Sequence, residues 1–591
     1  MHLHILSVSN LARVKDASPS TSNSQFPLQF NNTSHSAEYH TTMRLLLTSV
    51  FGPFGVDDQY GRRLNVMELF HNQVTREQGL FSLRINHPSF GLYLIAENLE
   101  IPTAVLDFPS LERFTKEVKK GYDYIGISSI VANFCKVKKM VEIIRELSPK
   151  TKIIIGGHCT SIPNIENLID SDYFSSGEGI SWFRRLLGED VNKPVRHPAI
   201  YSTLNRSVMG VPQPATAGVI VPGLGCVNAC SFCATTHHFQ KKYIGYLNTG
   251  KELYETLCEI EEKLGCDEFF VMDENFLKNL PRAQELLDLM ERDNKYFYLG
   301  VFSSAETVAA CGVEFMAKLG IDFVWIGVES KRSSYAKTKG IDLKSLIHDL
   351  REHGIQVLGS AILFLDHHTK ENIQEDIDFT IDLQTDFVQF MELGPLPGTA
   401  LYKEYDAAGR ILANVPFEDW HGQDKIWFSH PNFSRLETHD YLKDAFSQDY
   451  ERQGPSLLRL ADTSLRGYRT MKHNGDPRLH GMQSRLASRC KALRMLFRAS
   501  KTFSENSKTG EMVAYLEDQY GKEFGPMSLT DSLLSVVVQI FAWKERKFSL
   551  LKGTMRQPPT CYVEYRMPNG LTLPIISNLF SKRQLGSPSV S

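Results

Sequence analysis

Three cysteines lie close together in this 591-residue chain. Cys226, Cys230 and Cys233 stand in GCVNACSFCATTHHF with C-x3-C-x2-C spacing, while the other seven of the ten cysteines are scattered. Ten cysteines are too few for a disulfide scaffold in a chain of this length. Thiolates are the usual ligands of iron–sulfur clusters, and three of them can hold three irons of a cubane and leave the fourth open. The spacing therefore predicts an iron–sulfur site.

Two other interpretations of the cysteines stay open at this point. A structural zinc ion takes four ligands, and His237 or His238 follows closely enough to be the fourth. The three cysteines could also be small apolar residues of a core.

The cysteines come directly after the first strand of an alternating region, from about 217 to 430. Strands are expected at 217–223, 268–274, 296–304, 322–330, 356–364 and 386–394, with helices such as 250–265, 280–293 and 342–354 between them. Six βα units are too few for a complete eight-stranded barrel. We therefore expect a partial (β/α)6 TIM-type barrel with its chemistry at the carboxyl ends of the strands.

The cysteine loop, with Phe232 before its last cysteine, resembles the radical S-adenosylmethionine (radical SAM) superfamily. In that family the open iron of a 4Fe-4S cluster binds S-adenosyl-L-methionine, and reductive cleavage yields a 5′-deoxyadenosyl radical. The resemblance implies that Cys226, Cys230 and Cys233 hold the cluster and that Phe232 packs near the adenine. It also implies an electron donor such as a flavodoxin or ferredoxin.

Strand-end residues further along the chain are similar to other family positions. The resemblance implies contacts to the methionine amino group from Asp273, Glu274 or Asn275, to the ribose or carboxylate from Ser303 or Ser304, and a barrel-mouth carboxylate at Glu329. Each carboxylate could instead be a solvated cap at a strand end.

Residues 44 to about 186 also alternate between strands and helices. Strands are expected at 44–50, 103–108, 122–130, 152–158 and 172–179. This pattern predicts an open, doubly wound parallel sheet of the Rossmann-like kind, and such sheets bind ligands beyond the carboxyl ends of their strands.

The N-terminal region resembles the cobalamin-binding domains that precede some radical SAM domains, through YIGISSI, KIIIGGHCTS and YFSSGEG. The resemblance implies a cobalamin lined by Ser128, Ser129, Gly156, Gly157, His158, Thr160, Gly177 and Glu178. The stretch DFPSLERF lacks the Asp-x-His-x-x-Gly motif that supplies a lower cobalt ligand elsewhere. A domain that serves only as a lid or interface is the alternative.

The expected domains are a disordered extension (1–42), a cobalamin-binding-like domain (43–186), a linker (187–216), the radical SAM core domain (217–430) and a mainly helical C-terminal domain (431–591). Translation could also begin at Met43. The net charge of -3 gives no reason to expect nucleic acid as a partner. The chain has no apolar run of about 18 residues and no signal peptide, so we expect a cytoplasmic protein without a membrane span.

The combined resemblance implies an enzyme that methylates an unactivated carbon of a small-molecule, lipid or peptide substrate. Radical cyclisation or rearrangement, and a non-catalytic cobalamin or redox sensor, are the alternatives. Methylthio transfer is disfavoured, because only Cys135 and Cys159 lie in the N-terminal domain.

Overall fold

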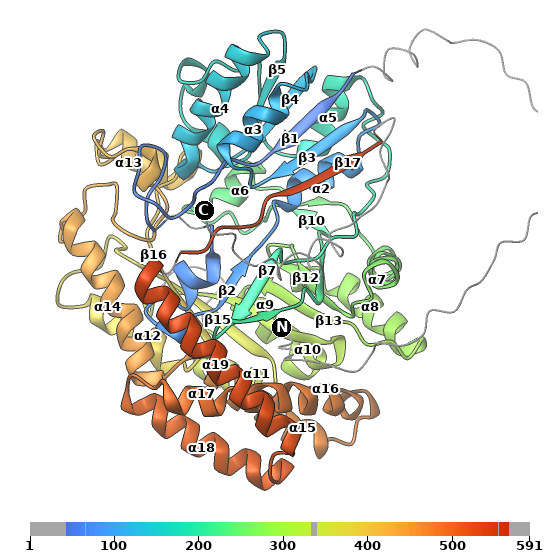
Figure 1. Cartoon of the computed structure of the whole chain (residues 1–591), viewed down its shortest axis with the longest axis vertical. Helices are drawn as coiled ribbons and strands as arrows, with labels where there is room; N and C mark the ends of the chain where they lie inside the picture. Colours follow the sequence, from blue (N-terminus) through green and yellow to red (C-terminus); the bar gives the residue numbers. More distant parts are fainter. Residues whose placement is uncertain (1–42, 65–66, 333–339, 554, 567–591) are drawn as a thin grey trace, which may run out of the picture.

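The computed structural model of the chain describes residues 43–64, 67–332, 340–553 and 555–566. The expected extension 1–42 lies outside these residues. Two six-stranded sheets organise the described part of the chain, and a group of helices follows them in sequence (Figure 1).

The first sheet belongs to the N-terminal domain. Its parallel strands are β1 (Leu45–Thr48), β3 (Thr103–Asp107), β4 (Tyr124–Ser128), β5 (Lys152–Gly156) and β6 (Tyr173–Ser175), in the spatial order β3-β1-β4-β5-β6. The strands are short apolar runs because both faces are covered. Helices α2 (Phe90–Glu97), α3 (Leu111–Val118) and α4 (Phe134–Leu147) lie between them in the chain, and α5 (Gly179–Leu187) follows β6. The order reverses between β1 and β4, which is where doubly wound sheets bind ligands.

A strand from the far end of the chain completes this sheet. β17 (Cys561–Tyr565) pairs antiparallel with β3, and Val563 lies opposite Val105. The C-terminal region, expected to be mainly helical, therefore also contributes the edge strand of the N-terminal domain.

The second sheet forms the central domain. Its strands are β9 (Ala217–Ile220), β12 (Glu268–Val271), β13 (Tyr298–Ser303), β14 (Ile321–Glu329), β15 (Gln356–Leu363) and β16 (Phe387–Glu392), which are parallel and follow one another in chain order. The helices between them are α7 (Gly250–Leu264), α8 (Leu280–Arg292), α9 (Ala305–Cys311), α10 (Val313–Leu319), α11 (Leu343–Glu352) and α12 (Ile373–Asp382). β9 and β16 do not pair with each other, so the six strands form the expected partial barrel. The outer edge of β9 pairs instead with residues 200–202, where the Val219 amide donates to the Ile200 carbonyl at 3.0 Å.

A segment of the N-terminal region closes the inner side of this open barrel. The single π-helical turn Phe70–Val74 packs on β16, where the rings of Phe70 and Phe387 lie 5.6 Å apart. A chain of hydrogen bonds crosses the barrel from Ser360 to Gln389 (2.7 Å) and on to Gln73 (3.1 Å).

The expected linker 187–216 has structure of its own. It contains β7 (Asn205–Val208) and β8 (Val211–Gln213), which form an antiparallel sheet with β2 (Arg84–Asn86). This small sheet joins the two larger domains.

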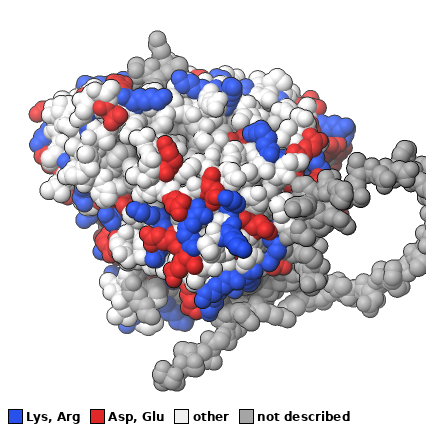
Figure 2. All heavy atoms as spheres, turned by 90° about the horizontal axis from the view of Figure 1, so that it is seen from above, with Lys and Arg blue, Asp and Glu red and all other residues white. Residues whose placement is uncertain are grey.

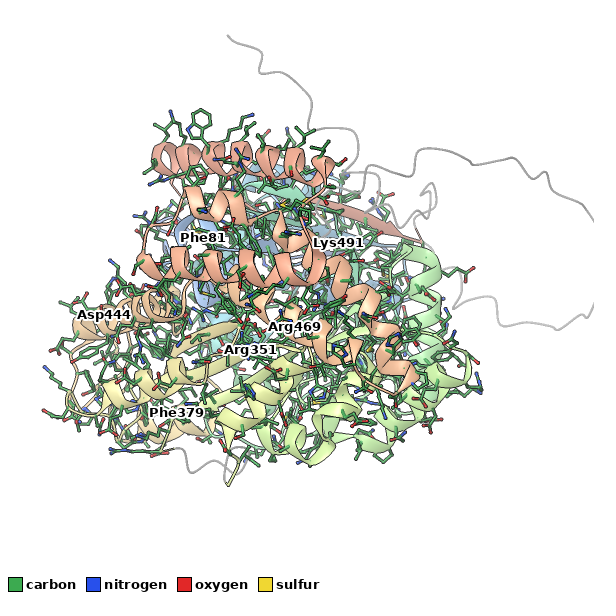
Figure 3. All side chains as sticks on the ribbon, turned by 90° about the horizontal axis from the view of Figure 1, so that it is seen from below. Phe81, Arg351, Phe379, Asp444, Arg469 and Lys491 are labelled. Carbon is green, nitrogen blue, oxygen red and sulfur yellow. The ribbon has the colours of Figure 1, made fainter. Side chains whose placement is uncertain are left out.

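Seven helices follow the last barrel strand in the described chain. They are α13 (Ala400–Ala407), α14 (Arg435–Gln453), α15 (Ser456–Lys472), α16 (Pro477–Arg494), α17 (Phe497–Thr502), α18 (Ser507–Phe524) and α19 (Leu529–Lys552). α13 lies beside the cysteine loop, whereas α15 and α16 cover the amino-terminal side of the barrel. Arginines of this region reach the starts of barrel strands: Arg485 pairs with Glu268 at 2.9 Å, and Arg489 pairs with Asp322. Figure 3 shows this helical face, with Arg351 and Arg469 among its ion-paired side chains.

Charges of both signs are interspersed on the face seen in Figure 2. In the described part of the chain, every helix is too short or too polar to cross a membrane.

Candidate active site

The three cysteines lie in the loop between β9 and the short helix α6 (Ala234–His238). All three are half-buried free thiols. The loop is held from within, because the Cys233 amide donates to the carbonyl of Cys230 at 3.2 Å and the Thr236 hydroxyl donates to the carbonyl of Cys226. The amide of Asn228 also points at the Cys226 sulfur, 3.5 Å away.

The three sulfur atoms do not all lie within 4.8 Å of one another, as the ligand atoms of His367, His368 and Asp376 do. Thiolates that share one zinc at 2.3 Å in a tetrahedron lie about 3.8 Å apart. The cysteine loop is therefore not arranged as a closed single-metal site.

The two histidines after the cysteines are used elsewhere. His238 accepts a hydrogen bond at Nε2 from the Gly177 amide (3.1 Å), and His237 accepts one from the Ala400 amide (3.4 Å). The first contact ties the cysteine loop to the N-terminal domain and the second ties it to α13. Both contacts use Nε2, and Nδ1 of His238 is buried without a hydrogen-bond partner among the described residues.

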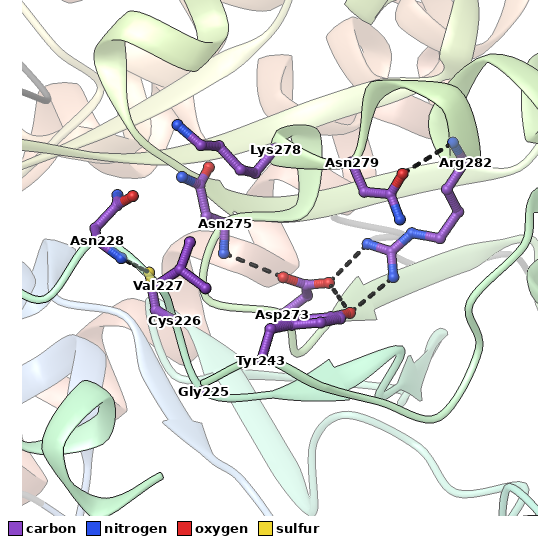
Figure 4. Close-up of a pocket in the computed structure, with 10 residues that line it drawn as sticks. All are labelled: Gly225, Cys226, Val227, Asn228, Tyr243, Asp273, Asn275, Lys278, Asn279 and Arg282. Atoms are coloured by element: carbon purple, nitrogen blue, oxygen red, sulfur yellow. Dashed lines mark hydrogen bonds and ion pairs between the residues drawn. The ribbon is translucent and has the colours of Figure 1, made fainter. Parts of the chain in front are cut away.

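A cavity of about 240 Å³ lies beside the cysteine loop (Figure 4). On its floor Asp273 accepts hydrogen bonds from Arg282 (2.7 Å) and from the Tyr243 hydroxyl (2.8 Å) at one oxygen, and from the Asn275 amide (3.1 Å) at the other. Both oxygens of the Asp273 carboxylate are thus committed to the protein. Asp273 thus helps to build the cavity wall, and its predicted contact to the cofactor stays a prediction.

Asn275 joins the next strand end in a buried network. Its side-chain oxygen accepts from the Ser303 hydroxyl at 2.9 Å, and its amide nitrogen donates to the Ser304 hydroxyl at 3.0 Å. Three of the predicted cofactor residues therefore lie together, at the carboxyl ends of β12 and β13.

Glu274 differs from its neighbours. Its carboxylate is accessible and has no hydrogen-bond partner among the described residues. Burial by the surrounding protein, reinforced by Asp273, raises its pKa to about 7. Glu274 is not among the residues that line the 240 Å³ cavity, although its neighbours Asp273 and Asn275 are. The Cys233 thiol is near enough for Glu274 to contribute to the rise of its pKa to about 11, of which burial is the main cause.

Two more predicted residues flank the barrel mouth. Glu329 is buried at the end of β14 and has a φ of 63°, next to a register shift in the strand pairing. Positive φ is costly for a residue with a side chain and marks an over-determined position. Phe232 packs against the apolar cluster that contains Phe364 and Leu401.

A larger cavity of about 560 Å³ lies at the carboxyl edge of the first sheet, at the switch between β1 and β4. Six of the eight residues predicted for cobalamin line it: Ser128, Gly156, Gly157, His158, Gly177 and Glu178. Ser129 and Thr160 are outside the lining, and the Thr160 hydroxyl instead donates to the Gly157 carbonyl at 2.8 Å.

Gly157 and Glu178 shape this cavity. Gly157 has a φ of 81°, and a Cβ there would stand 2.5 Å from the carbonyl oxygen of Ser129. The Glu178 carboxylate caps α5, accepting from the amides of Ile180 (2.7 Å) and Ser181 (2.8 Å) and from the Tyr246 hydroxyl (2.7 Å). Glu178 is therefore a structural carboxylate that joins the two domains.

The far wall of the larger cavity comes from the barrel and from α2. His238, Tyr246 and Met272 line it from the central domain, and Phe90 and Ile95 line it from α2. No local motif marks these residues, so the sequence could not assign them. The cysteine loop thus lines the smaller cavity, and the α6 helix that follows it lines the larger one.

Comparisons with known proteins agree with this geometry. Residues 220–380 match the model of the family described as the Radical SAM superfamily. An uncharacterized methyltransferase of Pyrococcus horikoshii is 22% identical over 395 residues, covering 60% of this chain and 83% of that protein. The bacteriochlorophyllide d C-8(2)-methyltransferase of Chlorobaculum tepidum is 25% identical over 329 residues, covering 51% and 71%.

Among solved structures, the radical S-adenosylmethionine methyltransferase TsrM from Kitasatospora setae, with cobalamin and a 4Fe-4S cluster bound, aligns with a TM-score of 0.48 and 14% identity. The alignment covers 76% of this chain and 99% of that one. The match over residues 220–380 includes all three cysteines. Residues 220–380 of this chain therefore form a radical SAM domain.

Proposed function

We propose that this protein is a cobalamin-dependent radical SAM methyltransferase that adds a methyl group to an unactivated carbon. The observation that carries the proposal is that adjacent residues line the two cavities: Leu224 and Met272 line the larger one, and Gly225 and Asp273 line the smaller one. The cysteine loop supplies Cys226 to the smaller cavity, and α6, which follows the loop, supplies His238 to the larger one. Two cofactors bound there would be neighbours.

The residues present fit both groups. Cys226, Cys230 and Cys233 would hold the 4Fe-4S cluster, and Glu274, with its free carboxylate, would take the amino group of S-adenosyl-L-methionine. The cobalamin would lie on Gly156, Gly157 and Gly177, where small residues let a flat macrocycle approach the backbone. When bound, the cluster and S-adenosyl-L-methionine supply hydrogen abstraction, and cobalamin supplies the methyl group.

The protein itself positions these groups and excludes water from them. The Arg282–Asp273 pair and the Asn275–Ser303–Ser304 network make the cavity walls rigid. Tyr246 and His238 hold the first sheet against the barrel. We expect a reduced flavodoxin or ferredoxin as electron donor, a cytoplasmic reaction, and a small-molecule, lipid or peptide substrate.

The first test is a measurement of iron, sulfide and corrinoid in protein purified without oxygen from cobalamin-supplied cells. We expect about four irons and one corrinoid per chain. A triple variant, Cys226→Ala, Cys230→Ala and Cys233→Ala, should lose the iron and keep the corrinoid. Cys258→Ala, a half-buried cysteine on α7, is the matched control and should keep both. Iron without corrinoid would leave a radical enzyme but contradict the methyl transfer.

Product analysis separates methylation from the alternative reactions. Methylation should form S-adenosylhomocysteine together with 5′-deoxyadenosine, whereas cyclisation or rearrangement should form no S-adenosylhomocysteine. A sensor would bind corrinoid without cleaving S-adenosyl-L-methionine under strong reductant.

A further inference from the structure

Helix α19 (Leu529–Lys552) presents an apolar stripe to solvent along most of its length. Its members are exposed large side chains: Leu529 (87%), Leu533 (69%), Val537 (37%), Ile540 (49%), Trp543 (47%), Leu550 (79%) and Leu551 (83%). At 100° per residue these positions fall on one side of the helix. A helix of 24 residues is about 36 Å long, so the stripe is far larger than a lone exposed leucine.

The opposite side of α19 is firmly packed, so the stripe is not the result of a loose helix. Val538 and Ala542 are fully buried in the apolar core that the C-terminal helices share with the barrel. A Cβ at Gly210 would stand 2.7 Å from the Cβ of Glu545, which shows how closely the helix crosses the β7–β8 turn. Figures 1 and 3 show α19 as an outer helix with one side against the body of the protein.

The charges on the exposed side are positive. Lys544 and Lys547 are exposed within the stripe, and neither has an ion-pair partner among the described residues. Lys547 lies over the Trp543 ring, with its ammonium 4.7 Å from the ring centre. The nearest acidic residue of the helix, Glu545, is turned inward and pairs with Arg556.

These features distinguish a lipid surface from a second copy of the chain. A second copy would bury Lys544 and Lys547 against a stripe that carries no carboxylate, and burying an unpaired ammonium is costly. At a membrane the lysine stems can lie along the acyl region while their ammonium groups reach lipid phosphates. Indole and leucine side chains flanked by lysines are typical of helices that lie in the plane of the interface.

We infer that α19 docks the protein on an anionic phospholipid surface, with its apolar stripe in the headgroup region and Lys544 and Lys547 on the phosphates. This contact is peripheral and leaves both cavities in the body of the protein. It is independent of the chemistry proposed above, because none of its residues lines either cavity.

The test is flotation of the full-length holoprotein with vesicles of phosphatidylcholine alone or with a third phosphatidylglycerol. We expect binding to the anionic vesicles and weakening by 0.5 M salt, which screens the lysines. Leu533→Glu with Ile540→Glu should lower the bound fraction at least tenfold, and so should Lys544→Glu with Lys547→Glu. Leu436→Glu is the matched control, since Leu436 is a similarly exposed leucine (71%) on α14, and should bind as the unchanged protein does.

Trp543 supplies a second readout, because it is exposed and the other four tryptophans of the chain are buried or half-buried. Its emission should shift to the blue with anionic vesicles, and Trp543→Phe should remove the shift while the protein still floats. Unchanged iron content and melting temperature would show that each variant is folded. Absent binding, equal binding to neutral vesicles, or a dimer that Leu533→Glu dissociates would each overturn the inference.

Discussion

The imidazole rings of His158 and His238 lie 4.6 Å apart, one at the end of a strand of the first sheet and the other in the helix that follows the cluster cysteines. Burial, together with the other histidine, lowers the pKa of His158 to about 4, and burial lowers the pKa of His238. Both rings are therefore neutral near pH 7 and can pack together without charge repulsion. This contact brings residues 80 positions apart into the wall of one cavity.

Gly157→Ala should damage the larger cavity. The new methyl group would meet the Ser129 carbonyl at 2.5 Å, and the backbone has a positive φ. We expect a lower melting temperature and less corrinoid per chain. Gly188→Ala is the control: it has a φ of 71° with nothing within 4 Å, so it should show only the left-handed backbone cost of about 1–2 kcal/mol. Equal corrinoid content in both variants would contradict the assignment of the larger cavity as the cobalamin site.

Two neighbouring carboxylates should behave differently when neutralised. Asp273→Asn leaves the buried Arg282 without its carboxylate, and breaking a buried pair costs about 3–5 kcal/mol. Glu274→Gln removes no hydrogen bond or ion pair among the described residues. It also takes away a carboxylate whose pKa burial raises to about 7, so the melting temperature at pH 7 should rise and not fall. Affinity for S-adenosyl-L-methionine, measured by equilibrium binding to reconstituted protein, should fall at least tenfold in Glu274→Gln. An unchanged affinity would show that Glu274 does not bind S-adenosyl-L-methionine.

Glu392 should make stability depend on pH. Burial at the end of β16, with Asp424 nearby, raises its pKa from 4.5 to about 8. Between these values the folded state keeps a proton that the unfolded state has released, so stability falls as the pH rises from about 4.5 to about 8. Glu392→Gln has no carboxyl group to titrate. The difference between its melting temperature and that of the unchanged protein should therefore increase from pH 5 to pH 8.

Glu112→Gln is the control for this pH dependence. Lys116 lowers the pKa of Glu112 on the exposed side of α3. Both the folded-state and the unfolded-state pKa of Glu112 lie below pH 5, so the corresponding difference in melting temperature should stay constant from pH 5 to pH 8. The same trend in both variants would mean that Glu392 is not the source.

Removal of β17 should weaken the first sheet and spare the barrel. Deleting residues 559–591 takes away the strand that pairs with β3 along five residues. Amide hydrogen exchange in β3 should become faster, while exchange in β14, at the centre of the other sheet, stays unchanged. Deletion of 567–591 alone keeps β17 and should leave β3 protected.

Most of the fold could be predicted from the sequence because its periodic signals are local. The parallel strands of both sheets are short apolar runs, and their alternation with helices predicted the doubly wound sheet and the partial barrel. The cysteine spacing predicted the iron–sulfur domain for the same reason: Cys226, Cys230 and Cys233 stand on one short loop.

Tertiary structure alone decided which polar groups are free. Asp273, Glu274 and Asn275 are consecutive in sequence. Arg282 and Tyr243 bind the carboxylate of Asp273, and Ser303 and Ser304 bind the side chain of Asn275. The pairing of β17 with β3, and of Arg485 with Glu268, likewise joins residues more than 200 positions apart. Such contacts depend on the packing of whole elements, which no local pattern encodes, whereas strand period and ligand spacing are properties of the chain itself.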